Sequence, residues 1–110
     1  MTLEALIKTL SLETVNLAEP EREVLGGYSG DLLSWVMGRA KSDYAWITIM
    51  TNVNVLAVAS LADVSCIIIT ENAEISDELI SIAKSKQINL LRSPKNSFEV
   101  SVELGKILGL

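Results

Sequence analysis

The segment Tyr44–Thr70, YAWITIMTNVNVLAVASLADVSCIIIT, decides the fold of this chain. Residues 44–50 are rich in β-formers, residues 52–64 are apolar in almost every helical direction, and residues 65–70 place three isoleucines in a row. A strand that is apolar on both faces is typical of a parallel sheet covered by helices. The segment therefore predicts strand, helix and strand in succession, a βαβ unit with a right-handed crossover.

The flanking sequence continues this alternation. Further helices are expected at 3–10, 31–37, 77–86 and 96–108, and further strands at 14–17, 22–28 and 88–93. Thr2, Asp31 and Ser76 are placed to cap helices, Gly38 to end one, and Asn96 and Glu99 have capping-box spacing. We predict one α/β domain over residues 1–110, with a small, mostly parallel sheet of four to five strands and helices on both faces.

Composition limits the partners that the chain could have. Its 110 residues are 49% hydrophobic and 21% charged, which is typical of one globular domain. The net charge is −5 and the nine lysine and arginine residues are scattered, so we expect no nucleic-acid partner. The single cysteine, Cys66, precedes the isoleucines and is expected in the core. The first residues lack the pattern of a secretory signal, which predicts a cytoplasmic protein.

One uncharged run, residues 44–62, is long enough to cross a bilayer. Thr51, Asn52 and Asn54 lie at its middle, where polar side chains would be costly in a membrane. A strand, a polar turn and a helix account for every residue of the run, so we expect no membrane partner.

The stretch GGYSG, residues 26–30, raises the question of a phosphate site. No lysine follows Gly30, so the stretch is not a P-loop, and its glycine spacing does not match the dinucleotide-binding fingerprint. Asp31 would also repel phosphate from the following helix. We therefore interpret the stretch as a turn or bulge, with a positive φ at Gly26 or Gly27.

Polar side chains follow each strand of the predicted parallel sheet. The carboxyl ends of such strands meet along one crevice, which is the usual ligand position in open α/β sheets. These residues could form a pocket for a small metabolite or nucleotide, although Ser, Thr and Asn also cap helices and form turns without any ligand, which is the simpler interpretation. The ligand-binding candidates are Thr51, Asn52, Asn54, Thr70, Asn72, Ser93 and Asn96.

The sequence offers little for catalysis. It contains no histidine, and one cysteine cannot build a thiolate metal cluster, so we expect no catalytic residue, no metal and no cofactor. Asp31 could pair with Asp43 or Asp63, but solvated surface carboxylates explain these residues better.

Residues 21–70 resemble the DRTGG domain family. The resemblance lies in the pair Glu21 and Arg22, the glycines Gly26 and Gly27, the GDLLS helix start, the WIT strand and a late SP...F element, and it extends over nearly the whole chain. Glu21 stands where the family name has Asp, and Leu25 stands where it has Thr.

This family resembles the N-terminal domain of HPr kinase/phosphorylase and occurs beside CBS domains in regulatory proteins. Kinase activity in the two-domain enzyme belongs to a domain that contains a P-loop. This sequence lacks the P-loop motif. The resemblance implies a non-catalytic regulatory module, which binds a small ligand, a partner enzyme or a regulatory protein. The alternative is a pure dimerisation or interaction module without a ligand.

The apolar helix expected near residues 52–64 also suggests self-association. Its apolar side chains point in too many directions for a helix that covers a sheet on one side and meets water on the other. We therefore expect a homodimer, with this helix at or just behind the contact.

Overall fold

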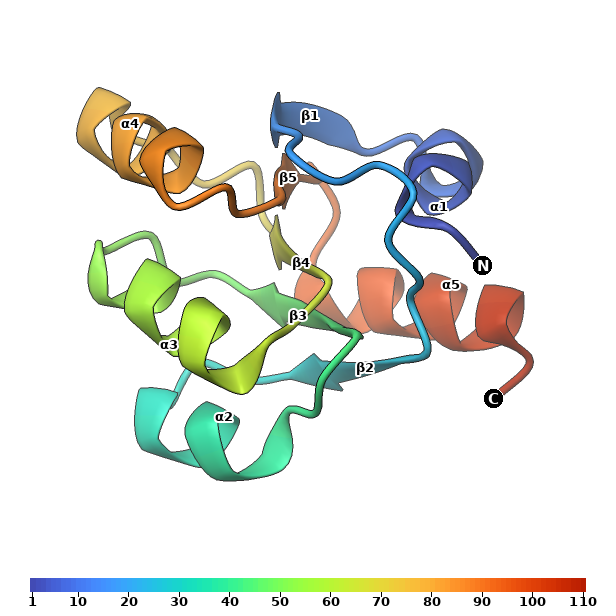
Figure 1. The fold of residues 1–110 in the computed structure, drawn as a ribbon. Helices are drawn as coiled ribbons and strands as arrows, with labels where there is room; N and C mark the ends of the chain where they lie inside the picture. The colour runs from blue at the N-terminus through green and yellow to red at the C-terminus, as the bar shows by residue number, and fades with distance from the viewer.

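The computed structural model describes residues 1–110 as a five-stranded sheet between two layers of helices (Figure 1). The strands have the order β1-β5-β4-β3-β2; β2 to β5 run parallel and β1 is antiparallel to β5. The prediction of a small, mostly parallel α/β sheet is confirmed. The elements are α1 (Leu3–Leu10), β1 (Glu13–Asn16), β2 (Gly26–Ser29), α2 (Leu33–Arg39), β3 (Tyr44–Thr48), α3 (Asn54–Ala62), β4 (Cys66–Ile69), α4 (Asp77–Ser85), β5 (Leu90–Arg92) and α5 (Ser97–Leu108).

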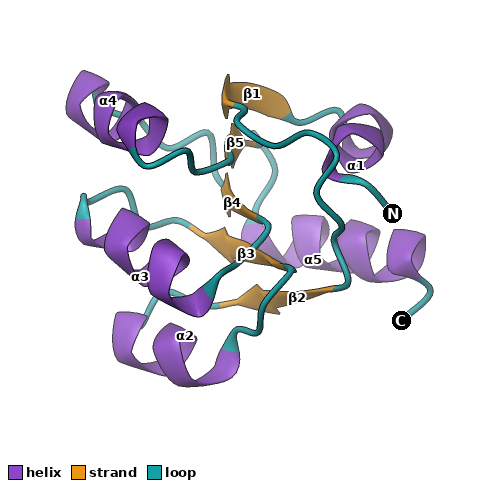
Figure 2. Cartoon of the chain, in the orientation of Figure 1, coloured by secondary structure: helices purple, strands orange, loops and turns teal.

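The central strand β4 divides the core into two. Cys66 and Ile68 belong to the cluster on the side of α1 and α5, whereas Ile67 and Ile69 belong to the cluster on the side of α2, α3 and α4 (Figure 2). All four side chains are buried, because side chains of a strand alternate between faces and both faces of this sheet are covered. Two-sided burial explains the run of isoleucines.

Most of the predicted helix caps are confirmed. The side chains of Thr2 and Ser76 accept hydrogen bonds from main-chain N–H groups three residues on, and Asn96 and Glu99 form a reciprocal capping box. Each such cap satisfies a main-chain donor that has no partner within the helix.

The start of α2 differs from the prediction. Asp31 does not cap this helix; its carboxylate accepts hydrogen bonds from the Thr48 hydroxyl at 2.7 Å and from Ile49 N–H at 3.0 Å. Leu32 takes the N-cap position without a side-chain hydrogen bond, and the helix runs past Gly38 to Arg39. Asp31 thus binds the end of β3, where a hydroxyl and a main-chain N–H both donate to its carboxylate, instead of capping the adjacent helix.

The predicted positive φ at Gly26 or Gly27 is wrong. The only glycine with positive φ is Gly109, and Gly26 and Gly27 belong to the extended strand β2. Both are glycines because other groups approach them closely: a Cβ on Gly26 would lie 2.7 Å from the Tyr44 ring, and one on Gly27 would lie 2.6 Å from Leu104 Cδ2. Close packing, and not a turn, therefore accounts for the double glycine.

Most apolar side chains of α3 are buried by the chain itself. Val55, Leu56, Val58 and Ala59 lie in the core shared with α2 and α4, whereas Leu61 is 73% exposed. The chain itself thus covers most apolar side chains of α3, and little apolar surface of this helix is left for a partner. None of the helices combines the length and the apolar character needed to cross a membrane.

Candidate functional site

The polar residues predicted to bind a ligand lie at the carboxyl ends of the parallel strands. Thr51, Asn52 and Asn54 lie between β3 and α3, Thr70 and Asn72 follow β4, and Ser93 and Asn96 follow β5. Because these three strands are parallel, the segments that follow them lie at the same end of the sheet.

Most of these polar groups are committed to the fold. Asn52 Oδ1 accepts from Asn54 N–H at 3.0 Å, and the Ser93 hydroxyl accepts from Lys95 N–H at 3.2 Å. The buried Thr70 hydroxyl lies 2.8 Å from Ser97 Oγ. These contacts are those of turns and caps, and neither of the two cavities in the structure is lined by a predicted ligand-binding residue.

The charged side chains that line a cavity lie instead at the opposite end of the sheet, near the amino ends of β4 and β5. A polar cavity of about 190 Å³ opens there between the segment before β2, the end of α3 and the turn after α4. Its polar lining comprises Glu19, Arg22, Ser60, Asp63, Ser65, Lys86, Gln87 and Asn89.

Arg22 organises one wall of this polar cavity. Its Nε donates to Asp43 Oδ1 at 3.1 Å, and its Nη2 donates to the carboxylate and the main-chain carbonyl of Asp63 at 2.9 and 2.7 Å. Nη1 has only a distant partner, Glu19 Oε1 at 3.9 Å. One guanidinium nitrogen is therefore weakly committed and available to a group entering the cavity.

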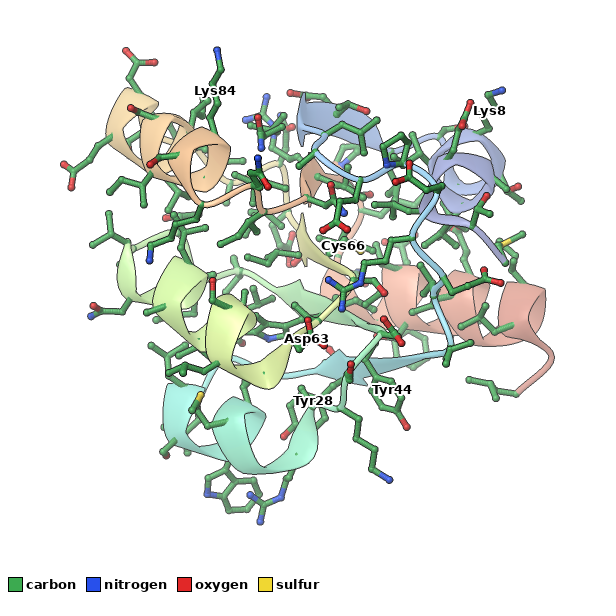
Figure 3. All side chains as sticks on the ribbon, viewed as in Figure 1. Lys8, Tyr28, Tyr44, Asp63, Cys66 and Lys84 are labelled. Atoms are coloured by element: carbon green, nitrogen blue, oxygen red, sulfur yellow. The ribbon has the colours of Figure 1, made fainter.

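The ion pairs at Arg22 shift the pKa values of both partners. Burial opposes the charged guanidinium, yet hydrogen bonds to Asp63 and Asp43 keep the pKa of Arg22 above its ordinary value. Asp63 also accepts from the Ser42 hydroxyl at 2.6 Å, and this bond, followed by that from Arg22, holds the pKa of Asp63 below its ordinary value. Figure 3 shows Asp63 at the end of α3, near the amino end of β4. The cavity wall is thus charged but locally neutralised.

Lys86 and Asn89 complete the polar cavity from the other side. Lys86 takes part in no ion pair, so its ammonium group is free to meet an anion. Asn89 is 3% exposed, and its amide accepts from Ala18 and Glu19 N–H and donates to the Glu19 and Ser65 carbonyls. Asn89 shapes the cavity, whereas Lys86 and Arg22 could contact a ligand.

Sequence analysis identified Arg22 but not its partners. Asp43 and Asp63 neither pair with Asp31 nor stand alone as solvated carboxylates, because both bind Arg22. Asn89 was assigned only to a strand. The one available signal was a polar residue inside an otherwise apolar strand, which indicates a buried hydrogen-bonding role.

A second cavity of about 210 Å³ lies between β2 and α5. Gly27, Tyr28, Ser29, Ile47, Ser101, Leu104, Gly105 and Leu110 line it, without a single charged side chain. We call it the β2 groove.

The predicted core position of Cys66 is confirmed by its burial. Cys66 is completely buried, and burial raises the pKa of its thiol to about 12, so it is a core residue as predicted. No group of three or more His, Cys, Asp or Glu side chains is placed to hold a metal ion.

A mostly parallel sheet covered by helices on both faces, with two small cavities, defines a small α/β domain. The DRTGG domain family matches residues 36–107, more than half of the chain, and the chain therefore belongs to that family. The matched segment begins at Val36, so Glu21, Arg22, Gly26 and Gly27 lie before it. No curated protein matches the chain significantly.

The fold is similar to that of a solved regulatory region. The structure contains the CBS and DRTGG domains of the regulatory region of a Clostridium perfringens pyrophosphatase, in complex with its activator diadenosine tetraphosphate. The TM-score is 0.73 at 22% sequence identity, and the match covers 94% of this chain and 45% of that chain. The similarity shows a shared fold over nearly all of this chain and about half of the pyrophosphatase region.

Proposed function

We propose that this chain is a non-catalytic regulatory module that binds a small ligand and forms a homodimer or docks on a partner enzyme or regulatory protein. The supporting observation is its fold similarity, over 94% of its length, to a regulatory region that was solved with a nucleotide activator. A cytoplasmic location belongs to the same proposal, and the free thiol of Cys66 fits a reducing compartment.

The ligand that we propose is a nucleotide or another phosphorylated metabolite, bound in part at the polar cavity. Arg22 Nη1 and the Lys86 ammonium group have the fewest bonding partners among the cationic groups there. Both can donate hydrogen bonds to a phosphate oxygen. Ordinary small-molecule pockets have volumes of roughly 300 to 1,000 Å³, whereas this cavity has about 190 Å³. A dinucleotide would therefore place only one end in it.

Thermal unfolding in the presence of diadenosine tetraphosphate, ATP and AMP tests ligand binding, because a ligand specific for the folded state raises the midpoint. Lys86→Ala should abolish the rise. Lys84→Ala is the matched control, since Lys84 lies in the last turn of α4, two residues before Lys86, but does not line the cavity (Figure 3). A rise that survives Lys86→Ala but is lost in Asn72→Ala would place the ligand at the strand ends instead.

The absence of any midpoint shift at millimolar concentrations would refute the ligand and favour the alternative, a pure interaction module. The specific observation behind this alternative is exposed apolar surface on α2. Trp35 is 53% exposed, with the Arg39 guanidinium 3.8 Å from the ring centroid, and Leu32 is 59% exposed. Tryptophan and arginine are enriched where partners bind.

The non-catalytic part of the proposal rests on chemistry that the side chains supply. The only thiol is buried with its pKa raised to about 12, and Asp43 and Asp63 are bound to Arg22. Purified protein should therefore transfer no phosphate from ATP to HPr or to a serine peptide. Phosphotransfer that disappears in an Arg22→Ala variant would contradict this.

A further inference from the structure

The two edges of the sheet are protected to different degrees. At the β1 edge, Glu13 binds Arg92 at 3.0 Å, the register is interrupted between Thr14 and Asn16, and Asn16 donates to the Ile88 carbonyl. Charges and bulges of this kind prevent an edge strand from pairing with another chain.

The β2 edge has no such protection. β2 pairs only with β3, so one side of its backbone lacks a strand partner. Residues 26–30 contain no charge, no proline and no bulge, and Gly27 and Ser29 are exposed. Figure 3 shows Tyr28 and Tyr44 beside this strand at the open edge of the sheet. An uncharged, regular edge is suited to β-sheet extension.

We propose that β2 is the seam of a symmetric homodimer, in which β2 pairs antiparallel with the same strand of a second copy. This inference rests on the dimer in the proposed function and adds its location. A two-fold axis brings identical strands together in antiparallel orientation, so one contact closes both open edges. The joined sheet would then end only at its two protected β1 strands.

The lack of charged side chains at this edge would let a second copy of this chain approach despite the shared negative charge. Two chains of net charge −5 repel each other, and an uncharged face is where they can approach at the least cost. The nearest charge in sequence, Asp31, is already bonded to Thr48 and Ile49. No charged side chain lines the β2 groove beside the edge.

The exposed area beside β2 can supplement that of the strand. A stable interface buries about 800 Å² per partner, more than a four-residue strand alone provides. Leu25, directly before the strand, is 61% exposed, and Leu110, which lines the β2 groove, is 81% exposed. Pairing across the seam would cover both leucines.

Sedimentation equilibrium of charged variants tests the seam. Ser29→Lys places like charges near the two-fold axis and should weaken the dimer at least tenfold, as should Ser29→Glu. An equimolar mixture of the two variants should restore wild-type affinity, because opposite charges then face each other. Circular dichroism would show that each variant is folded.

Two controls locate the contact. Thr14→Lys on the β1 edge and Leu61→Glu on α3 should both leave the dimer affinity unchanged, since neither residue lies at β2. Hydrogen exchange of the β2 amides should slow as wild-type concentration passes through the dimer dissociation constant, whereas β1 amides should not change.

A wild-type protein that is monomeric at tens of micromolar, or a folded Ser29→Lys variant that dimerises with wild-type affinity, would overturn the seam. Dissociation by Leu61→Glu alone would move the contact to α3. Calorimetry with the same proteins tests ligand binding, which is the other part of the proposed function. A loss of ligand binding can therefore be distinguished from the absence of the β2 seam.

Discussion

Arg22 Nη2 donates to both the carboxylate and the main-chain carbonyl of Asp63, so one side chain ties the segment before β2 to the end of α3. Through Nε, Arg22 also binds Asp43, directly before β3. Both aspartates have left-handed backbones, with φ of 57° at Asp63 and 66° at Asp43, a conformation that aspartate adopts more readily than most residues. Arg22 therefore links two left-handed turns at the edge of the polar cavity.

Replacing Arg22 with Ala should lower the free energy of unfolding by about 1.5 to 3 kcal/mol, because it removes charge-assisted hydrogen bonds from a mostly buried side chain. Arg22→Lys should recover only part of this, since an ammonium group cannot reach all three acceptors. Urea unfolding gives both values. Lys8→Ala, which breaks an exposed pair with Glu4, should change stability by less than about 0.5 kcal/mol. Equal effects at Arg22 and Lys8 would contradict this role.

Stability should fall in acid partly through Asp63. Its pKa is held below the ordinary value of 3.8 by Ser42 and then Arg22, so below about pH 4 the unfolded chain binds more protons than the folded one. The contribution of Asp63 is therefore present at neutral pH and is lost as pH falls through its folded pKa. Asp63→Asn should flatten the decline measured by urea unfolding between pH 4 and about pH 2. Parallel curves for the wild type and Asp63→Asn would show that its ionisation does not matter.

The glycine of β2 that faces α5 gives a prediction about packing. Gly27→Ala should destabilise the protein by about 1 to 3 kcal/mol, because the new methyl group meets Leu104 Cδ2 at 2.6 Å and the buried Leu104 side chain has to shift. Gly105→Ala on α5 is the matched control: nothing lies within 4 Å of its Cβ position, and alanine is the better helix former, so stability should rise by about 0.5 to 1 kcal/mol.

A double-mutant cycle separates packing from backbone effects at Gly27. If Leu104 causes the clash, Gly27→Ala should cost less in a Leu104→Ala background than in the wild type. Equal costs in the two backgrounds would exclude the clash as the cause.

Local features of this fold could be predicted from sequence because their causes are local. The caps at Thr2, Ser76 and Asn96 depend on groups three residues away, and the burial of 66–69 depends on a short run of apolar residues. The position of Asp31 just before a helix suggested a cap in the same way. That prediction failed because the donors at Thr48 and Ile49 are brought to Asp31 by strand pairing.

The polar cavity could not be predicted because its contacts join distant parts of the chain. Arg22 meets residues 21 and 41 positions later, and Asn89 bonds to residues about 70 positions earlier. Glycine spacing was equally uninformative, since it does not distinguish a left-handed turn from a strand that a neighbour approaches closely. Only the register of β2 and β3 places Tyr44 over Gly26.

Asn89 gives the last prediction. Its buried side-chain amide accepts from Ala18 and Glu19 N–H at 2.8 and 2.9 Å and donates to the Ser65 carbonyl at 2.9 Å. Asn89→Ala would leave these main-chain groups without a side-chain partner at a part-buried site. Because each unsatisfied buried group costs about 1 to 3 kcal/mol and partial relaxation reduces the sum, we expect a loss of about 2 to 4 kcal/mol in urea unfolding.

Asn89→Asp separates hydrogen bonding from volume, because it keeps the size and the acceptor Oδ1 but replaces the amide nitrogen, which donates to the Glu19 and Ser65 carbonyls, with a second oxygen. This variant should also be destabilised, and more so at neutral pH than at pH 4, since a buried carboxylate is costly when charged. Asn52→Ala, which removes one exposed turn hydrogen bond, should cost about 1 kcal/mol or less. If Asn89→Ala costs no more than Asn52→Ala, the amide does not hold the segment before β2 against the sheet, and the polar cavity must owe its shape to Arg22 alone.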